Sequence, residues 1–151
     1  MVSAKRGRSR TTTAQMSVAE IAPRRLLLDT HVWLWMQAND ARLGPQARRL
    51  LMQASEVRFS AASAWEIAIK AAIGKLTLPP DADIEGELAH NGFLALPIDI
   101  AHANHVRGLP LVHRDPFDRL LVAQALREGL TVLTADTQLA AYGISVVDAR
   151  V

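Results

Sequence analysis

The segment Leu26–Met36, LLLDTHVWLWM, predicts the first strand and the first helix, and it holds a carboxylate where the pattern favours a core. Leu26–Leu28 is a short apolar run that ends in Asp-Thr, which is typical of a buried strand. Thr30 is expected to cap a helix that continues to about Gln37. Asp29 therefore stands at the carboxyl end of a strand, directly before a helix.

Short apolar runs and helical patterns alternate along the rest of the chain. Such strands suit a parallel sheet that is covered on both faces. The predicted fold is α/β, a three-layer α/β/α sandwich with a central parallel sheet. The further strands are expected at residues 57–60, 93–96, 131–134 and 144–147, and the clearest helices at 45–54, 63–73, 100–106, 116–128 and 138–142.

Length and composition restrict the class of protein. The chain has 151 residues, half of them apolar, which fits one domain with a sizeable core. It has no cysteine, which excludes disulfides and thiolate metal sites and fits a cytoplasmic location. No apolar run approaches the roughly 20 residues of a membrane helix, so no membrane partner is expected.

The first 24 residues differ in composition from the rest. Residues 1–25 carry a net charge of +5, which leaves −3 on the remainder of a chain whose total is +2. Residues 1–24 are polar, basic and without apolar periodicity, so we expect a disordered extension before a single domain at 25–151. The extension either contacts nucleic-acid phosphates or is a stretch upstream of a true start at Met16.

Two acidic residues lie at strand ends. Asp29 ends the first strand, and Asp136 follows the strand TVLT (131–134) after one intervening residue. Ligands of open parallel sheets bind beyond the carboxyl ends of the strands. If these two strands are neighbours, the two carboxylates meet at one edge of the sheet.

Glu66 lies in the segment SAWEIAIK, on a helix expected to begin at Ser63. Trp65 and Ile69 are expected to face the core, which places Glu66 at the border of the apolar stripe. Its ordinary interpretation is a solvent-exposed ion pair with Lys70 at i+4.

Asp118 lies in the segment HRDPFDRLLVAQAL. With Asp115 as helix cap and Pro116 at the first helical position, Asp118 falls in the first turn. Its ordinary interpretation is a capping acid that the helix dipole favours.

The four acids together predict more than each does alone. Two carboxylates 4 Å apart repel by about 4 kcal/mol at an effective dielectric constant near 20. Carboxylates that converge must therefore take up protons or bind a cation. Oxygen ligands without cysteine suit a hard cation, Mg²⁺ or Mn²⁺, which can activate water for attack on a phosphodiester.

Four segments resemble, in the same order, the PIN-domain nucleases and among them the VapC-like toxins of bacterial type II toxin–antitoxin systems. The resemblance covers residues 26–147, and HRDPFDRLLVAQA is the most specific part of it. The segments are LLLDTHVWLW, SAASAWEIAIKAAIGKLTLP, LPLVHRDPFDRLLVAQAL and LTADTQLAAYGISVV.

This resemblance implies a metal-dependent ribonuclease that hydrolyses phosphodiester bonds in RNA and holds Mg²⁺ or Mn²⁺ with four acids. Thr134 is a candidate support of the site through its hydroxyl group. Asp115 is either a helix cap or an outer carboxylate of the site. The catalytic and metal-binding acids are, by motif, Asp29, Glu66, Asp118 and Asp136.

The resemblance also implies a homodimer and a cognate antitoxin protein that lies in a groove near the acids. Exposed apolar contacts for the antitoxin include Trp33, Trp35 and Leu43, unless these residues pack in the core. Arg114 and Arg119 flank the third acid and are candidate contacts to RNA phosphates.

Other classes fit the sequence less well. His102 and His105 are spaced as metal ligands on a helix, but a surface pair is the expected interpretation because no third ligand is evident. His31 stands where haloacid-dehalogenase phosphotransferases need a second aspartate, and no glycine-rich phosphate loop is present. The remaining alternative is a non-catalytic PIN-like module that binds RNA or a partner protein.

Overall fold

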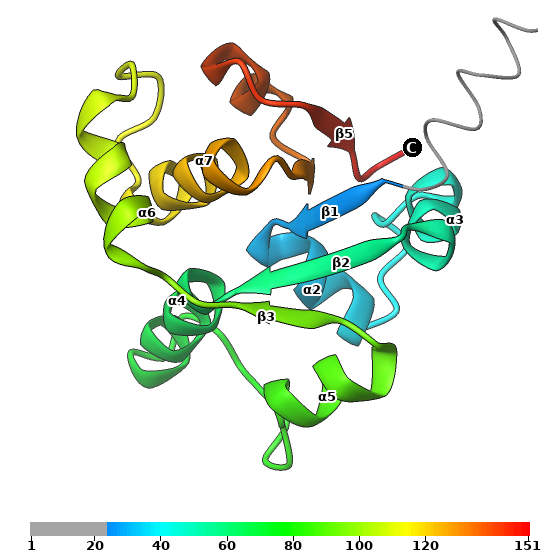
Figure 1. Cartoon of the computed structure of the whole chain (residues 1–151). Coiled ribbons are helices and arrows are strands. Elements are labelled where there is room, and N and C mark those ends of the chain that lie inside the picture. The colour runs from blue at the N-terminus through cyan, green and yellow to red at the C-terminus, as the bar shows by residue number, and fades with distance from the viewer. Residues whose placement is uncertain (1–23) are drawn as a thin grey trace, which may run out of the picture.

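The computed structural model describes residues 24–151, so the expectation of a disordered extension falls, except for Arg24, on residues outside the described part. Five parallel strands form one central sheet in the order β3-β2-β1-β4-β5, with helices on both faces (Figure 1). The predicted α/β/α sandwich is confirmed. The strands are β1 Arg25–Leu28, β2 Glu56–Ser60, β3 Leu94–Leu96, β4 Thr131–Thr134 and β5 Val146–Asp148.

The helices follow the predicted pattern, with shifted ends. Thr30 is the first residue of its helix and Asp29 is the cap residue, so the expected capping by Thr30 is wrong. The helical segments are α2 Thr30–Gln37, α3 Pro45–Gln53, α4 Ala61–Ala72, α5 Ile84–Asn91, α6 Ile100–His105, α7 Pro116–Glu128, and the 3₁₀ helices η1 Val106–Gly108 and η2 Thr137–Tyr142.

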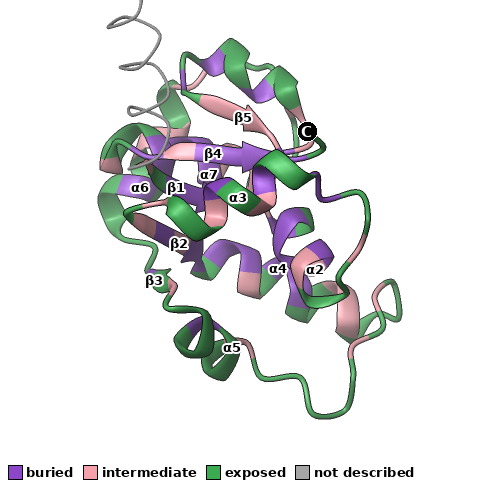
Figure 2. Ribbon diagram, turned by 90° about the vertical axis from the view of Figure 1, so that its right-hand side faces the viewer, coloured by how far each residue is buried: buried purple, intermediate pink, exposed green. Residues whose placement is uncertain are grey.

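Alternating side chains of the central strand supply both halves of the core. Leu26 and Leu28 join a cluster with residues of α2, α3 and β2, whereas Leu27 joins a second cluster built mainly on α7 and η2. All three leucines are fully buried, and Figure 2 shows buried residues on β1, β2 and β4 and on the helix sides that face them. Burial on both faces explains why β1 is an uninterrupted apolar run.

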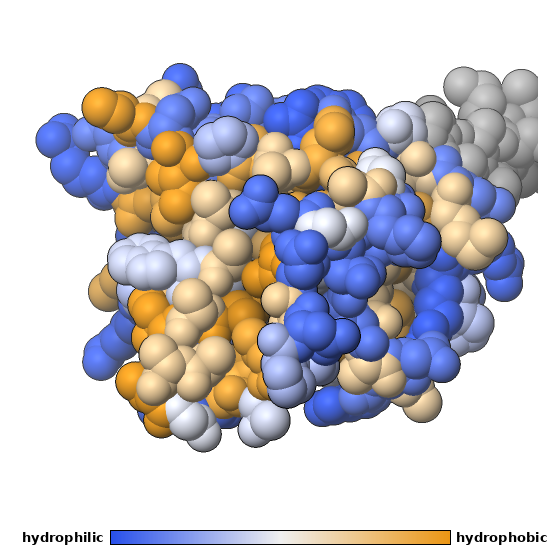
Figure 3. Space-filling model, turned by 90° about the horizontal axis from the view of Figure 1, so that it is seen from below, coloured by the Kyte–Doolittle hydropathy of each residue, from blue (hydrophilic) through white to orange (hydrophobic). Residues whose placement is uncertain are grey.

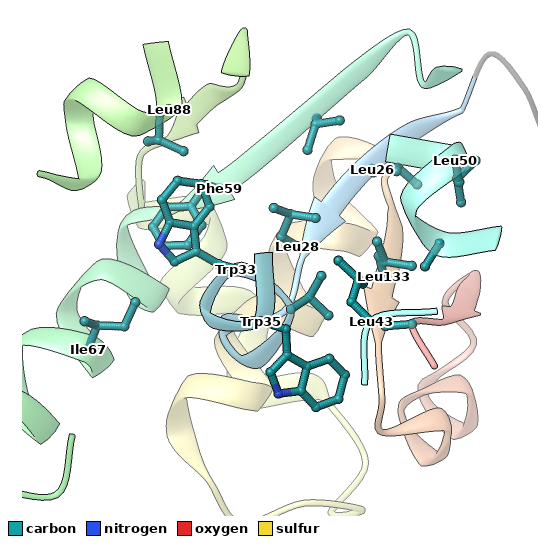
Figure 4. Packing of buried hydrophobic residues seen from close by; sticks show 14 residues of the cluster. Leu26, Leu28, Trp33, Trp35, Leu43, Leu50, Phe59, Ile67, Leu88 and Leu133 are labelled. Carbon is teal, nitrogen blue, oxygen red and sulfur yellow. The ribbon is translucent and has the colours of Figure 1, made fainter. Parts of the chain in front are cut away.

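The two tryptophans of α2 belong to this core. Trp33 packs against Phe59 with ring centroids 4.9 Å apart, and Trp35 and Leu43 lie in the same cluster (Figure 4). Trp33 is 2% exposed, Trp35 8% and Leu43 3%. Of the two alternatives for these residues, antitoxin contact or core packing, the structure supports core packing, because their apolar area is already buried in the fold.

The sheet order places a topological switch at the centre of the molecule. The chain passes from β1 to β2 and β3 on one side, then returns to β4 and β5 on the other. The crevice of such a sheet opens at the carboxyl ends of the strands next to the switch, here β1 and β4. Among residues 24–151, no helix is long and apolar enough to cross a bilayer.

Candidate active site

Asp29 and Asp136 meet at the switch, joined by one hydroxyl group. Asp29 follows β1, and its backbone N–H donates to the Leu133 carbonyl (3.0 Å). Thr134 Oγ1 donates to Asp29 Oδ2 (2.6 Å) and accepts from the backbone N–H of Asp136 (2.9 Å). The two strands are direct neighbours, which is the condition under which the two carboxylates were predicted to meet, and the Thr134 hydroxyl contacts both acidic segments.

Glu66 reaches the same place from α4. This helix begins at Ala61, two residues before the predicted start, because Ser60 Oγ accepts from the Ala62 N–H (3.0 Å). Glu66 is 6% exposed, and its carboxylate is paired with Lys70 Nζ at 2.8 Å. The predicted ion pair is present, but its acid is buried rather than in solvent.

The expected orientation of α4 is wrong. Trp65 is 59% exposed and Ile69 is 37% exposed, whereas the buried side of the helix carries Ser63, Glu66 and Ile67. The buried side is polar because part of it faces the acids. Its Ser63 hydroxyl lies 2.8 Å from the Thr30 hydroxyl, in a buried contact that joins α4 to α2.

Asp118 lies in the first turn of α7, as predicted. Asp115 is the cap residue, with Oδ1 accepting from the Phe117 N–H (2.8 Å). Burial raises the pKa of Asp118 to about 7, and the nearby charges of Asp115 and Asp29 add to the rise. Burial also raises the pKa of Asp29. For both carboxyl groups, burial outweighs the nearby His31 and His113, which act to lower the two pKa values.

His113 is a site residue that the sequence analysis missed. Its Nε2 lies 2.7 Å from Asp136 Oδ2, and its backbone N–H donates to the Tyr142 hydroxyl (2.7 Å). His113, Asp118 and Asp136 each offer one ligand atom within 4.8 Å of the others. The only signal in the sequence is a histidine two residues before the α7 cap, which by itself does not indicate a contact with Asp136.

The four acids line one open cleft of about 580 Å³ at the carboxyl edge of the sheet. The cleft brings together all four predicted acids, with Lys70 and Arg150 as the cations at its wall. Its lining comprises Asp29, His31, Glu66, Lys70, Asp115, Asp118, Ala135, Asp136, Thr137, Gln138 and Arg150.

The donor set fits a hard divalent cation. Glu66 already has a cationic partner, but Asp29 and Asp118 have raised pKa values because they are buried near other acids. A divalent cation among them would remove this unfavourable charge. Carboxylate oxygens are the ligands that Mg²⁺ and Mn²⁺ prefer, and one imidazole is compatible with Mn²⁺.

The two arginines expected to bind phosphate differ. Arg119 donates from its guanidinium group to backbone carbonyls of the preceding loop, at Val106 (3.1 Å), Pro110 (2.9 Å) and two further residues. Its donors are used to hold the loop, so its predicted role as a phosphate contact is not supported. Arg114 is exposed.

His102 is not part of a surface pair. It is 1% exposed, its Nδ1 accepts from the Asp99 N–H (3.1 Å), and its Nε2 lies 3.0 Å from Glu128 Oε1. The prediction of a surface histidine is therefore wrong, because His102 ties α6 to the end of α7.

The PIN domain family model matches residues 26–144. The chain belongs to the PIN domain family. No curated protein matches it in sequence. The match covers most of the described residues and contains every acid of the cleft.

Solved structures share the fold of this PIN domain. A chain of DNA-bound VapBC from Salmonella typhimurium is 21% identical with a TM-score of 0.59, covering 83% of this chain and 98% of that chain. A chain of VapBC2 from Rickettsia felis, bound to a promoter DNA fragment, is 9% identical with a TM-score of 0.57; the match covers 82% of this chain and 97% of that chain. A chain of a toxin–antitoxin complex from Klebsiella pneumoniae is 16% identical with a TM-score of 0.55; the match covers 82% of this chain and 97% of that chain.

Proposed function

We propose that this PIN domain is a metal-dependent endoribonuclease, the toxin of a type II toxin–antitoxin pair that acts in the cytoplasm. The observation that carries the proposal is the convergence of Asp29, Glu66, Asp118 and Asp136 on one open cleft. The structural neighbours from VapBC and other toxin–antitoxin complexes support the toxin assignment.

Asp29, Asp118 and Asp136 are proposed to hold Mg²⁺ or Mn²⁺, with Glu66 at the border of the site. The bound cation would polarise a water molecule and stabilise the charge that develops on the phosphate and the leaving oxygen. In hydrolysis the water oxygen forms a bond to phosphorus and one bridging P–O bond breaks.

The side chains of the chain itself fix the geometry of this reaction. The Thr134 hydroxyl directs one Asp29 oxygen, and His113 holds one oxygen of Asp136. Lys70 stays charged because its hydrogen bond to Glu66 raises the Lys70 pKa. A cation at this wall of the cleft favours the approach of an RNA phosphate.

Cleavage of mixed unstructured RNA, with Mg²⁺ or with EDTA, tests the proposal. The wild-type protein, purified free of antitoxin, should cut RNA only with the cation, and Asp29→Asn and Asp118→Asn should lower the rate by at least about 100-fold. If the wild type binds RNA but leaves it intact under all conditions, the chain is a non-catalytic binding module instead.

The antitoxin partner is proposed to lie along α2. Two adjoining grooves run between α2 and the segment 76–84, and one of them reaches His31 at the border of the acidic cleft. The grooves share Leu34, Gln37, Leu78 and Pro79, and the lining of the first also includes three acidic residues, Asp81, Asp83 and Glu87. This lining suits an extended or helical peptide with apolar and basic side chains. The same toxin–antitoxin neighbours support this assignment.

We also propose that the chain forms a homodimer. Ile100 is 86% exposed and Leu111 is 78% exposed, so apolar area remains outside the core that an association between copies would cover. Analytical ultracentrifugation of the protein without antitoxin tests this; a monomer at micromolar concentration contradicts it.

A further inference from the structure

A second depression adjoins the acidic cleft and differs from it in chemistry. It shares Glu66, Lys70 and Asp115 with the cleft and then continues between α4 and the start of α7. We call it the α4–α7 trough. Its other lining residues are Ile69, Ile73, Lys75, Arg114, Pro116 and Phe117.

The trough is lined by two basic side chains, Lys75 and Arg114, that form no ion pair within residues 24–151. Within residues 24–151, neither Lys75 nor Arg114 has an acidic side chain within 4 Å, whereas Lys70 is paired with Glu66. Asp115 lies on the border shared with the acidic cleft, and its Oδ1 accepts from the Phe117 N–H. The far part of the trough is therefore positive and the near part acidic.

The backbone holds both cations at the trough. Gly74 has φ +75°, a left-handed conformation that lets the chain turn back after α4, and the Lys75 N–H donates to the Lys70 carbonyl (2.8 Å). Arg114 lies between His113, whose N–H donates to Tyr142, and the α7 cap Asp115. Their side chains thus start from fixed positions.

The walls between these cations are apolar and aromatic. Ile73, which directly follows α4, is 60% exposed, and the rings of Phe117 and Trp65 pack edge to face with centroids 5.3 Å apart. Figure 3, which views the molecule from below, shows hydrophobic side chains gathered on its left-hand part, the side on which α4 lies in Figure 1. Because Trp65 contacts Phe117 in this way, the position of the Phe117 ring is restricted, and a base can stack on it.

We propose that the α4–α7 trough binds the nucleotides next to the scissile phosphate of an unpaired RNA strand. Lys75 and Arg114 contact the backbone phosphates, and Phe117 with Ile73 contacts a base. Cations that follow a backbone, interleaved with an aromatic face, are what single-stranded nucleic acids require. Because the trough opens onto the acids, a strand that lies in it carries its next phosphate into the cleft. The inference rests on the proposed ribonuclease function.

Binding and cleavage of a fluorescein-labelled unstructured oligoribonucleotide test the inference. Anisotropy in EDTA reports binding without cleavage, and initial rates with Mg²⁺ give KM and kcat. The double variant Lys75→Gln/Arg114→Gln should raise Kd and KM on the order of tenfold with little change in kcat. The salt slope, log Kd against log salt, should fall by about 1.4, or about 0.7 for each lost phosphate contact. Phe117→Leu, which keeps an apolar side chain, should weaken binding by at least about fivefold.

The matched control is Arg49→Gln/Arg127→Gln, which removes the same charge from exposed positions on α3 and the last turn of α7. It should change Kd by less than about twofold. If the trough variant behaves like this control, or if the wild type does not bind RNA, the inference is wrong. If Phe117→Leu changes the sedimentation of the protein but not its RNA affinity, a second copy covers the trough and the inference is also wrong. If RNA binding changes as expected but neither the wild type nor the variants cut RNA, the RNA-binding role of the trough is supported and the ribonuclease proposal is wrong.

Discussion

Single side chains that connect the acids determine the geometry of the cleft. Asp29 and Asp136 were predicted because each follows an apolar strand, and strand ends are visible in sequence. His113 was not predicted, because its contact with Asp136 depends on how the loop before α7 folds back over η2. Arg119 lies beside the third acid in sequence, yet its guanidinium group faces loop carbonyls. Sequence neighbours of an acid are thus poor guides to its spatial neighbours.

His113→Gln should lower metal affinity and the cleavage rate roughly 10- to 100-fold, because supports of metal ligands contribute effects of this size. The change removes the imidazole contact at Asp136 Oδ2 and keeps a polar side chain. Mn²⁺ titration and cleavage rates measure it, with the exposed His90→Gln on α5 as control. Equal affinity for Mn²⁺ in both variants would show that His113 does not support the site.

The buried acids predict how stability depends on pH. The folded-state pKa of Asp118 is about 7 against an ordinary value of 3.8, and that of Asp29 is also raised. Between about pH 4 and pH 7 the folded protein binds more protons than the unfolded chain, so its stability falls as the pH rises. Without metal, the Tm should be lower at pH 8 than at pH 5.5. Mg²⁺ should raise the Tm more at pH 8, where it displaces fewer protons.

Thermal unfolding with EDTA or Mg²⁺ at the two pH values measures both effects. The control is Asp29→Asn/Asp118→Asn, which removes the two titrating groups and should flatten the pH dependence between pH 5.5 and pH 8. A wild-type protein that is more stable at pH 8 without metal contradicts the assignment of raised pKa values.

At the scale of elements, the sequence was sufficient to predict where the strands and helices lie along the chain, but not which side of each helix faces the core. The apolar residues Trp65, Ile69 and Ile73 recur at helical spacing, which predicts an inward stripe by periodicity alone. In the structure the side of α4 that holds Glu66 faces inward, because β2 and α2 place it against the cleft. An outward apolar stripe and an inward acid are the opposite of the usual pattern. The spacing of apolar residues could not predict this orientation, because it carries no information about where the neighbouring elements lie.

One buried amide joins α7 to the end of β2 and to the residue that follows β3. Gln124 accepts from Ser60 Oγ and donates to the Pro97 carbonyl (3.2 Å), and it is fully buried. Gln124→Leu should lower the free energy of unfolding by about 1–3 kcal/mol, because it leaves buried polar groups without partners. Chemical denaturation measures the loss. The control Gln46→Leu, at an exposed position of α3, should change stability by less than about 0.5 kcal/mol. Equal effects at both positions would contradict this account of the amide.

At the scale of the whole molecule, the last residues of the chain close the fold against α3. The Gly44 N–H donates to the Ala149 carbonyl (2.9 Å) and the Ala47 N–H to the Val151 carbonyl (2.9 Å). A methyl group at Gly44 would lie 2.4 Å from backbone atoms of Val151. The sequence predicted the helix that begins at Pro45, but not that residues 149–151 satisfy its first N–H groups, because this contact joins distant parts of the chain.

Gly44→Ala should therefore lower the free energy of unfolding by about 1–3 kcal/mol, as expected for an overpacked contact. Denaturation in urea measures it. Gly108→Ala is the matched control, because a methyl group there meets nothing within 4 Å and φ is not positive, so stability should be unchanged or slightly higher. If Gly44→Ala is as stable as the control, residues 149–151 can shift without a loss in the free energy of unfolding, which would contradict this account.

The central proposal is that one cation held by the acids of the cleft is required for RNA cleavage. Titration of Mn²⁺ into the protein, followed in parallel by metal binding and by the rate of RNA cleavage, tests this most directly. We predict that binding and rate reach half of their maxima at the same Mn²⁺ concentration, and that Asp29→Asn removes both. RNA cleavage that persists in EDTA, or unchanged Mn²⁺ binding and cleavage in Asp29→Asn, would contradict the account.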